Sequence, residues 1–509
     1  MPSSQFSLRT ISKSVLETEY AVRGAVPLRA LAIDRELDDP ELAKKYPFDR
    51  IVYCNIGNPM LLGLEYALFL RNYIALVLAP HVLTHSDAEI CRIFNCNQNC
   101  IDRARAFLAK NPSGLGAYTT TKGFPSVRRE VADFLERRDG FPADPEDIYL
   151  TDGASLPVKA VIKLLSGPNP FDSAILLPIP QYPLYSATLT LCSVHAVHYE
   201  LHEEDDWSVR MDELRRRVDE HHATSKSTIR AIVIINPGNP TGSVLTHKAL
   251  SSLVDFCDEK GLVILSDEVY QANIYAPEPE KDRPVFHSMK KVLREWEKAK
   301  GREGPSLFSF HSVSKGVLGE CGLRGGFVEC CNIPKDVGME LYKVFSLCLC
   351  ANTVGQLAIS VMTNPPDDVG YKKHTQTVFE SLERRAQILS RSLGNVPFMT
   401  CETVSGAMYA FPRIYLPEYF VTEARKANLP PDSYYCLRLL EDTGVCTVPG
   451  SGFLQQSGTF HIRLTTLEDE SRFEDFLLKI RNFHFKVWAD ASEPERTRVE
   501  EEIKRRMKK

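Results

Sequence analysis

Long apolar runs are missing from the 509-residue chain. The most hydrophobic stretch, residues 61–80, is interrupted by Glu65, Arg71 and Asn72, so no segment predicts a membrane span. An excess of basic charge is missing as well, because the formal net charge is -5 and the sequence pI is about 6.3. That balance argues against a nucleic-acid partner. We therefore expect neither a membrane nor a nucleic acid among the partners.

A cysteine framework and a metal-ligand pattern are also missing. The 14 cysteines are dispersed, and the cluster at Cys91, Cys96 and Cys100 lacks the paired spacing of a zinc site. With no secretory signal pattern, we expect reduced structural thiols, no metal and a cytoplasmic location. The Ser, Arg and Lys residues that precede the first acidic residue, Glu17, leave a mitochondrial transit peptide as the alternative.

Short apolar strands alternate with helical segments through the middle of the chain. Strands are predicted at 148–151, 174–177, 229–235 and 262–266, and helices at 125–139, 156–165 and 245–260. A polar cluster follows the end of each strand. This is the α/β pattern, in which ligands bind at the carboxyl ends of parallel strands. The length of the chain predicts at least one further domain.

One lysine is a candidate reactive amine because it closely follows the apolar run 307–310. Lys315 lies between small polar residues, with Arg324 one short loop further on. A lysine in such a setting needs a partner or must become the neutral amine, the form that attacks a carbonyl. The hydroxyls and Arg324 are suited to holding a phosphate beside it. From this stretch alone, an ordinary loop lysine is an equally good interpretation.

Three other positions each allow both a functional and a structural interpretation. The turn 152–155 between a strand and a helix is a possible anion site or a common structural turn. Tyr182, between two prolines, is either a flat platform or a packing residue. Arg463 is a lone arginine within an apolar strand, so it requires either a substrate anion or an internal salt bridge.

Taken together, these motifs resemble the fold-type I pyridoxal 5'-phosphate (PLP) aminotransferases, and more narrowly the alanine aminotransferases. The resemblance extends over about residues 20–487. It rests on the stretches 55–59, 116–118, 150–155, 178–185, 236–242, 312–316, 319–322 and 448–453.

The resemblance implies the architecture. We expect an α/β fold with a large domain whose mainly parallel seven-stranded sheet lies in an α/β/α sandwich, and a smaller α+β domain built from the N-terminal and C-terminal segments. The expected division is an arm at 1–50 with one short helix, the small domain at 51–105 and 370–487, the PLP-binding domain at 106–369 and a charged tail at 488–509. From residue 492 on, the tail is expected to be a solvated or frayed helix. The Lys- and Glu-rich segment 277–304 is expected to be a surface insertion with a helix near 288–298.

The resemblance also implies the cofactor contacts. Lys315 would bind PLP covalently and then move a proton during the reaction. Asp267 would pair with the pyridine nitrogen and keep it protonated; the alternative is a carboxylate that caps the next helix. Asn239 and Tyr270 would donate hydrogen bonds to the phenolic oxygen, and Tyr182 would stack on the ring. The phosphate would be held by Ala154, Ser155, Ser312, Ser314 and Arg324.

The substrate contacts follow from the same resemblance. Arg463 would bind the substrate α-carboxylate, with Gly57 and Asn239 beside it. Tyr118 would reach the phosphate of the neighbouring subunit, which implies a homodimer with shared active sites; local packing of this tyrosine is the alternative.

We expect an aminotransferase that converts L-alanine and 2-oxoglutarate to pyruvate and L-glutamate by a ping-pong mechanism. The alternatives are an aminotransferase with another small amino donor or with glyoxylate as acceptor, a PLP-dependent lyase or synthase, and a non-enzymatic relative. The chain departs from the alanine pattern at Met60, Val317, Leu318 and Leu323, which we expect near the mouth of the site or the arm. Those departures leave the choice of substrate open.

Overall fold

The computed structural model describes residues 6–20, 24–278 and 282–506. The parts of the expected arm, insertion and tail at 1–5, 21–23, 279–281 and 507–509 lie outside the described residues, as do Ser3 and Ser4 of the transit-peptide pattern. Within the described ranges, the largest sheet has eight strands in the order β2-β9-β8-β7-β6-β3-β4-β5. Their bounds are β2 (Ile148–Asp152), β3 (Ser173–Ile179), β4 (His195–His202), β5 (Ser208–Val209), β6 (Thr228–Ile235), β7 (Val263–Asp267), β8 (Leu307–Ser312) and β9 (Gly325–Cys331).

The sheet is mainly parallel, as expected. Strands β4, β3, β6, β7 and β8 are parallel neighbours, whereas β9 is antiparallel to both β8 and β2. The seven expected strands are present, and β5 adds a two-residue antiparallel edge strand beside β4. In the register of the sheet, Asp267 lies opposite Ile235 of β6 and Phe310 of β8. The carboxyl ends of three central strands therefore meet at one edge.

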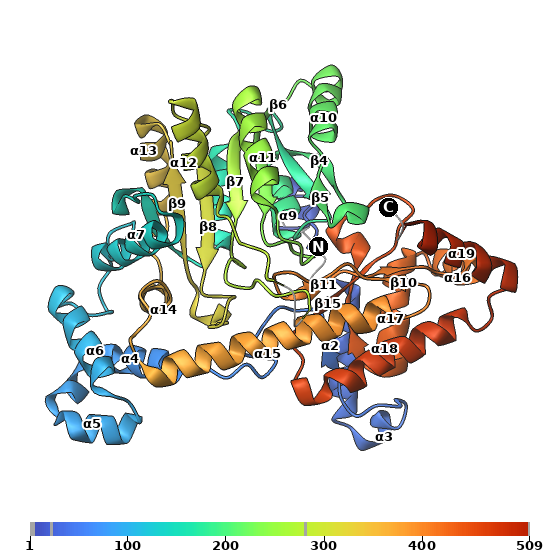
Figure 1. The fold of residues 1–509 in the computed structure, drawn as a ribbon, viewed down its shortest axis with the longest axis horizontal. Helices are drawn as coiled ribbons and strands as arrows, with labels where there is room; N and C mark the ends of the chain where they lie inside the picture. Colours follow the sequence, from blue (N-terminus) through green and yellow to red (C-terminus); the bar gives the residue numbers. More distant parts are fainter. Residues whose placement is uncertain (1–5, 21–23, 279–281, 507–509) are drawn as a thin grey trace.

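Helices cover both faces of this sheet, which confirms the α/β/α sandwich (Figure 1). Alternate strand residues serve the two faces: Leu176 packs into one apolar cluster, and Ile175 and Leu177 pack into the other. The first face carries α10 (Met211–Thr224), α11 (His247–Lys260) and α12 (Met289–Lys300), and the second α8 (Ser155–Leu164), α9 (Leu184–Leu191) and α13 (Lys335–Ser346).

Helix α12 corrects the expectation of a surface insertion at 277–304. Met289, Leu293 and Trp296 are buried in the cluster that joins α11 to the sheet. Their spacing of three and four residues places them on one face of the helix, with the charged side chains on the other. Residues 289–300 are therefore part of the layer that covers the sheet, and their charge content alone was misleading.

A second body combines the beginning and the end of the chain, as the smaller α+β domain requires. Its small sheet has the order β11-β15-β14, with β11 (Tyr409–Ala410), β14 (Val448–Pro449) and β15 (Ile462–Thr465). Strand β1 (Val52–Tyr53) pairs with β13 (Val445–Cys446) nearby, and β10 (Met399–Thr400) pairs with β12 (Arg413–Ile414). The helices packed around them include α2 (Ala25–Leu37), α15 (Val369–Gly394), α16 (Glu418–Lys426), α17 (Pro431–Thr443) and α18 (Phe473–Trp488).

The expected assignment of residues 51–105 to the small domain is wrong for much of that range. Residues 67–107 pack into the apolar cluster of the large domain, together with α7 (Pro125–Asp139) and α14 (Thr353–Thr363). The helices concerned are α4 (Leu68–Leu78), α5 (Asp87–Phe94) and α6 (Gln98–Lys110). The apolar faces of these helices predict burial, but they do not predict whether the helices pack against the core of the large domain or that of the small domain. The other expected domain boundaries stay predictions.

The arm and the tail are also more ordered than expected. Besides α1 (Lys13–Leu16) and α3 (Pro40–Ala43), residues 1–50 contain α2, whose Ala30 and Ile33 are fully buried. The tail forms α19 (Glu493–Arg506), which buries Val499 and places Nη2 of Arg506 2.7 Å from Oε1 of Glu203. Residues 493–506 thus form a helix that packs against the small domain. No helix in the described ranges has the length and apolar character needed to cross a membrane.

Candidate active site

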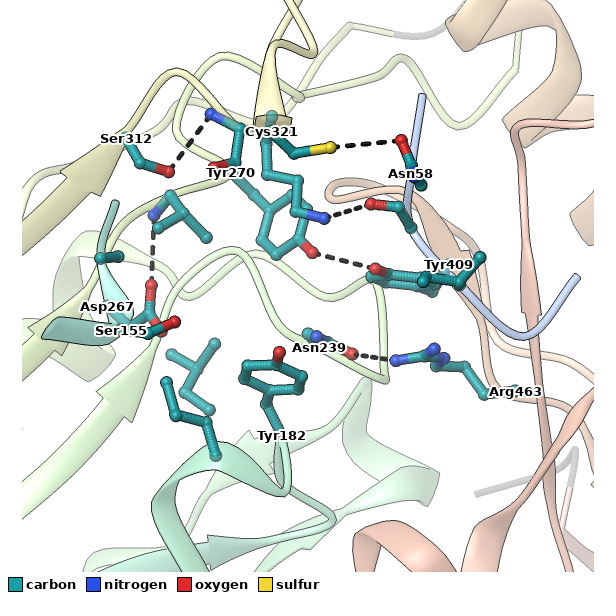
Figure 2. Close-up of a pocket in the computed structure, with 18 of the residues that line it drawn as sticks. Asn58, Ser155, Tyr182, Asn239, Asp267, Tyr270, Ser312, Cys321, Tyr409 and Arg463 are labelled. Atoms are coloured by element: carbon teal, nitrogen blue, oxygen red, sulfur yellow. Dashed lines mark hydrogen bonds between the residues drawn. The ribbon is translucent and has the colours of Figure 1, made fainter. Parts of the chain in front are cut away.

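The predicted site residues converge on one cavity of about 440 Å³ at the carboxyl ends of the sheet strands, between the two bodies (Figure 2). The volume lies within the range of small-molecule sites. All predicted residues except Tyr118 line this cavity: Gly57, Ala154, Ser155, Tyr182, Asn239, Asp267, Tyr270, Ser312, Ser314, Lys315, Arg324 and Arg463. Tyr118 is 77% exposed on the loop before α7, outside the cavity.

Lys315 enters the cavity from the loop after β8. Its Nζ donates a hydrogen bond to the backbone carbonyl of Gly57 at 2.6 Å and lies 5.7 Å from the ring centre of Tyr270. Among the described residues, no carboxylate forms an ion pair with this amine. A Cβ atom at Gly57 would lie 3.0 Å from Nζ, so the close approach requires glycine. The amine is therefore directed by backbone and remains available for chemistry.

Asp267, the last residue of β7, lies on the other side of the cavity. Its carboxylate is buried and accepts hydrogen bonds from the Tyr185 hydroxyl at 2.8 Å and from the Val269 amide at 3.3 Å. Burial raises the pKa of Asp267 to about 6, although these hydrogen bonds and the charge of Lys315 oppose the shift. The described residues supply no cation in contact with it, so the carboxylate is suited to a cationic ring nitrogen on a ligand.

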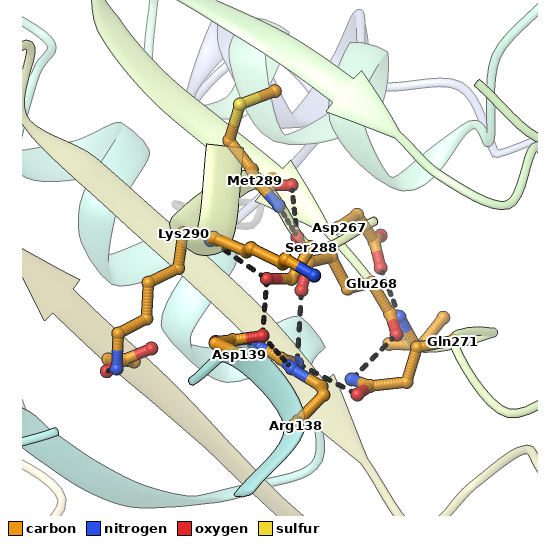
Figure 3. Close-up of polar contacts among 12 residues, drawn as sticks. Arg138, Asp139, Asp267, Glu268, Gln271, Ser288, Met289 and Lys290 are labelled. Carbon is orange, nitrogen blue, oxygen red and sulfur yellow. Dashed lines mark hydrogen bonds and ion pairs between the residues drawn. The ribbon is translucent and has the colours of Figure 1, made fainter. Parts of the chain in front are cut away.

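A charged network supports the strand end that carries Asp267 (Figure 3). Glu268 lies 3.4 Å from Nη1 of Arg138 and accepts a hydrogen bond from the Met289 amide at 2.8 Å. Arg138 also pairs with Asp139, which accepts a hydrogen bond from the Ser288 hydroxyl. Burial raises the pKa of Glu268 to about 7. Helices α7 and α12 thereby fix the end of β7.

The turn before α8 and Arg324 form a site for an anion. Gly153 has a φ of 70°, and a Cβ atom there would lie 2.4 Å from Nη2 of Arg324. The guanidinium donates hydrogen bonds to the carbonyls of Cys321 and Asp152, at 2.9 and 3.0 Å, but meets no carboxylate in the described ranges. It faces the N-terminal end of α8, where backbone N–H groups are free to bind an anion. Ala154, Ser155, Ser312 and Ser314 line the same part of the cavity.

Arg463 is buried on the opposite wall, in β15, with a relative exposure of 1%. It donates hydrogen bonds to Oδ1 of Asn239 at 3.2 Å and to the carbonyl of Asn55 at 2.5 Å, while its Nε has no partner. Its guanidinium lies 4.2 Å from the ring centre of Tyr409 and 4.7 Å from that of Phe453. No carboxylate of the described chain neutralises it. The internal salt bridge weighed from the sequence is therefore absent from these residues.

Three tyrosines near the cavity were missed as site residues. Tyr409 and Tyr20 line the cavity, and Tyr185 holds Asp267. The Tyr20 hydroxyl lies 2.7 Å from that of Tyr182, and burial raises the pKa of Tyr182. Tyr409 belongs to β11, which pairs antiparallel with the strand of Arg463. The sequence did not predict the pairing of β11 with β15, and only this pairing would have placed Tyr409 in the cavity.

The positions that depart from the alanine pattern lie outside the cavity lining. None of Met60, Val317, Leu318 and Leu323 lines the cavity. Val317 packs against the core of the small domain, and Leu318 is buried in the core of the large domain. Their expected place near the mouth of the site or the arm stays a prediction. Asn352 caps α14 through its side chain.

The fold and the lysine-containing cavity define the class of protein. The structure is similar to an aminotransferase from Escherichia coli, with a TM-score of 0.71 and 23% identity over 93% of this chain and 98% of that chain. It is equally similar in fold to an alanine aminotransferase from Pyrococcus furiosus, with a TM-score of 0.71 and 21% identity over 94% and 100% of the two chains. At such identities the likeness shows the fold alone.

The sequence shows the family. Residues 94–474 match the family model of aminotransferase class I and II, and the chain belongs to this family. It is 43% identical to a probable mitochondrial alanine aminotransferase of Dictyostelium discoideum, over 94% of this chain and 88% of that protein. It is 42% identical to glutamate–glyoxylate aminotransferase 1 of Arabidopsis thaliana, over 93% and 95%. It is also 38% identical to an inactive alanine aminotransferase of Saccharomyces cerevisiae, over 94% and 96%.

Proposed function

We propose that this chain transfers the amino group between L-alanine and 2-oxoglutarate with PLP, by a ping-pong mechanism. The observation that carries the proposal is Arg463, a buried arginine with an unpaired Nε and no carboxylate partner in the described chain, in the same cavity as Lys315 and Asp267. A buried guanidinium in this state is stabilised by a ligand anion. The α-carboxylate is what alanine, glutamate and their keto acids have in common.

The unpartnered groups fit PLP. Asp267 is suited to the pyridine nitrogen, Arg324 and the start of α8 to the phosphate, and Lys315 to the aldehyde carbon. When bound, PLP supplies an electron sink for the carbanion formed at the substrate Cα. Tyr182 lies where it could cover the ring, and Asn239 and Tyr270 line the same cavity between these ends.

In the proposed mechanism, different residues of the chain bind the substrate, transfer the proton and position these groups. Arg463 binds the substrate carboxylate and so places the Cα hydrogen toward Lys315. The Lys315 amine accepts that proton at Nζ and donates it again later in the same half-reaction. The hydrogen-bonded wall of Asn55, Asn239 and Gly57 keeps the arginine and the amine at fixed positions. One arginine serves both substrates of the ping-pong cycle.

A half-reaction screen tests this proposal. The protein is loaded with PLP, single amino acids are added without a keto acid, and the visible absorbance of the lysine-bound cofactor is followed. We expect L-alanine to bleach the band and to release one equivalent of pyruvate. Loss of the band without a keto acid from any amino acid would indicate a lyase or synthase instead, and an unchanged band would indicate a non-enzymatic relative.

Glyoxylate is the second candidate acceptor, because a glutamate–glyoxylate aminotransferase is 42% identical to this chain. In the second half-reaction, the amino-loaded protein is offered 2-oxoglutarate or glyoxylate, and the return of the absorbance is timed. Faster return with 2-oxoglutarate supports the proposal. Faster return with glyoxylate assigns the alternative and leaves the aminotransferase mechanism unchanged.

The pH dependence of stability tests the role of Asp267. Its pKa is about 6 in the folded chain and 3.8 ordinarily. Between these values the unfolded chain has lost a proton that the folded chain retains, so folding stability falls as the pH rises through this window. Two pKa units correspond to about 3 kcal/mol. Bound PLP should reverse the trend, because its ring nitrogen supplies the missing cation.

We therefore expect Asp267→Asn, in the protein without PLP, to be more stable than wild type at pH 8 by about 1–3 kcal/mol and equal to it near pH 4. Urea unfolding at the two pH values measures this difference. The same variant should lose transaminase activity, because a neutral amide does not keep the ring nitrogen protonated. If the variant gains no stability at pH 8, Asp267 is not an unpaired buried carboxylate.

We also propose a homodimer with shared active sites. Tyr118 is exposed and lies away from the cavity of its own chain, and the end of α13 beside its loop exposes Leu347 and Leu349. The two segments are adjacent, because the hydroxyls of Thr121 and Ser346 lie 3.3 Å apart. A second copy of the chain would cover this apolar surface and bring its Tyr118 to the first copy's phosphate site.

The cellular location stays a proposal. We propose the cytoplasm, with the mitochondrion as the alternative, since several relatives are named as mitochondrial enzymes. Fractionation of cells that express the full chain distinguishes the two.

A further inference from the structure

One polar group in the cavity has no part in the mechanism above: the hydroxyl of Tyr409. The side chain is buried, and its hydroxyl accepts a hydrogen bond from Tyr270 at 3.2 Å (Figure 2). A Cβ atom at Gly57 would lie 1.9 Å from the hydroxyl oxygen, so this oxygen rests directly against the backbone whose carbonyl accepts from Lys315. The same point lies 3.0 Å from the Lys315 amine, so the amine and the hydroxyl approach Gly57 from neighbouring positions, and the charge of Lys315 acts on the phenol.

Two cations face this phenol from different elements. Lys315 approaches from the loop after β8, and Arg463 of β15 lies 4.2 Å from the ring centre. The remaining titratable groups that face it are Tyr270 and Tyr182. No described carboxylate is among its hydrogen-bond partners. Burial acts to raise the pKa of Tyr409, but the two cations and the hydrogen bonds outweigh it and lower the pKa below the ordinary value.

We propose that Tyr409 is a positioning residue for Lys315, whose hydroxyl, together with the Gly57 carbonyl, fixes the direction of the amine and shares its proton during transamination. The inference rests on the proposed function. When Nζ is neutral, the Tyr409 hydroxyl donates to its lone pair. When the Cα–H bond breaks and a new N–H bond forms at Nζ, the phenol oxygen becomes the acceptor. The proton stays within the pair, so no further reactant is needed.

A purely structural role is the competing explanation, because the Tyr409 ring also packs against Arg463. Tyr409→Phe separates the two, since it keeps the ring and removes only the hydroxyl. The matched control is Tyr435→Phe, at a tyrosine that is equally buried, whose hydroxyl lies 3.1 Å from Nδ1 of His484, and that does not line the cavity.

The first readout needs no activity. The full chain without PLP is titrated from pH 7 to 11, and tyrosinate formation is followed by ultraviolet difference absorbance. We expect wild type and Tyr435→Phe to show one tyrosine that ionises below the ordinary range, and Tyr409→Phe to lack that step. Lys315→Ala should move the step to higher pH, because one cation is removed. Identical curves for wild type and Tyr409→Phe would overturn the proposal.

The second readout separates positioning from packing. With saturating L-alanine, Tyr409→Phe should lower kcat by about 10- to 100-fold, the loss of one hydrogen bond to a charged group, and change KM by less than about threefold. Deuterium at the alanine Cα should slow the variant more than wild type, because proton transfer becomes rate-limiting. The pH profile of kcat should also shift in the variant.

The outcomes distinguish this inference from the proposed function. If wild type does not transaminate any amino acid but the low tyrosine ionisation depends on Tyr409 and Lys315, the pair exists and the proposed function is wrong. If wild type transaminates alanine and Tyr409→Phe retains its kcat and isotope effect, the positioning role is wrong and the proposed function stands. If Tyr409→Phe raises KM and leaves kcat unchanged, Tyr409 acts only by packing against Arg463.

Discussion

Lys315→Ala should lower kcat for transamination of L-alanine by at least about 10⁴-fold, the upper range of what a single proton-transfer group contributes. Among the residues that line the cavity, Lys315 is the one lysine, so no second amine can replace it. Its side chain is half-buried and forms no ion pair in the described chain, so its truncation should leave the fold intact. Stopped-flow absorbance and pyruvate release measure the loss.

Lys315→Arg is the control for charge. An arginine keeps a cation at this position but does not become a neutral nucleophile at working pH, so this variant should be as inactive as Lys315→Ala. Circular dichroism and the unfolding midpoint of both variants should match wild type. Substantial activity in either variant would show that the amine is dispensable and would remove the basis of the proposed mechanism.

The inactive Lys315→Ala chain also tests the dimer. Co-refolded with an inactive Tyr118→Ala chain, it should form mixed dimers in which one site combines Lys315 of one subunit with Tyr118 of the other. Activity should then reappear on mixing, although neither parent is active. If Tyr118 acts within its own chain, every site in the mixed dimer carries a defect and no activity returns.

The part of the site that the sequence predicted is the part built from strand ends. Asp267 and Lys315 each follow an apolar strand by at most a few residues, and parallel neighbours end at the same edge of a sheet. Their proximity therefore follows from local order and from topology. Arg463 was predicted for a different reason, since a charge inside an apolar strand is costly without a ligand.

The residues that were missed depend on how separate segments meet. Tyr409 is one of several apolar positions in a short strand, and its role depends on the pairing of β11 with β15. Tyr20 comes from the N-terminal arm, and only the tertiary fold brings it to Tyr182. Helices α12 and α19 were judged by their charge, whereas buried Leu293 and Val499 decide where they pack. The charge content of such a helix describes its exposed face, whereas the few apolar residues on its buried face determine where it packs.

Arg463→Lys should lower kcat/KM for L-alanine and for 2-oxoglutarate to a similar extent, because in the proposed mechanism one guanidinium binds both α-carboxylates. Removing one partner of a buried charge pair costs about 2–5 kcal/mol, or about 30- to 4,000-fold, and lysine cannot restore the bidentate geometry. The conservative control is Arg385→Lys, a mostly buried arginine that donates to the carbonyls of Leu467 and Glu468. That variant should change stability more than kcat/KM.

The measurement is steady-state kinetics with each substrate varied in turn, together with binding of a simple carboxylate to the PLP-loaded protein. Arg463→Lys should weaken carboxylate binding and leave the cofactor absorbance in place, because the guanidinium lies on the wall opposite Asp267 and Arg324. A loss confined to one substrate would mean that the two carboxylates bind at different places. The buried Nε of Arg463 has no partner in the described chain, so it is open to the carboxylate of either substrate, and an equal loss is the expected result.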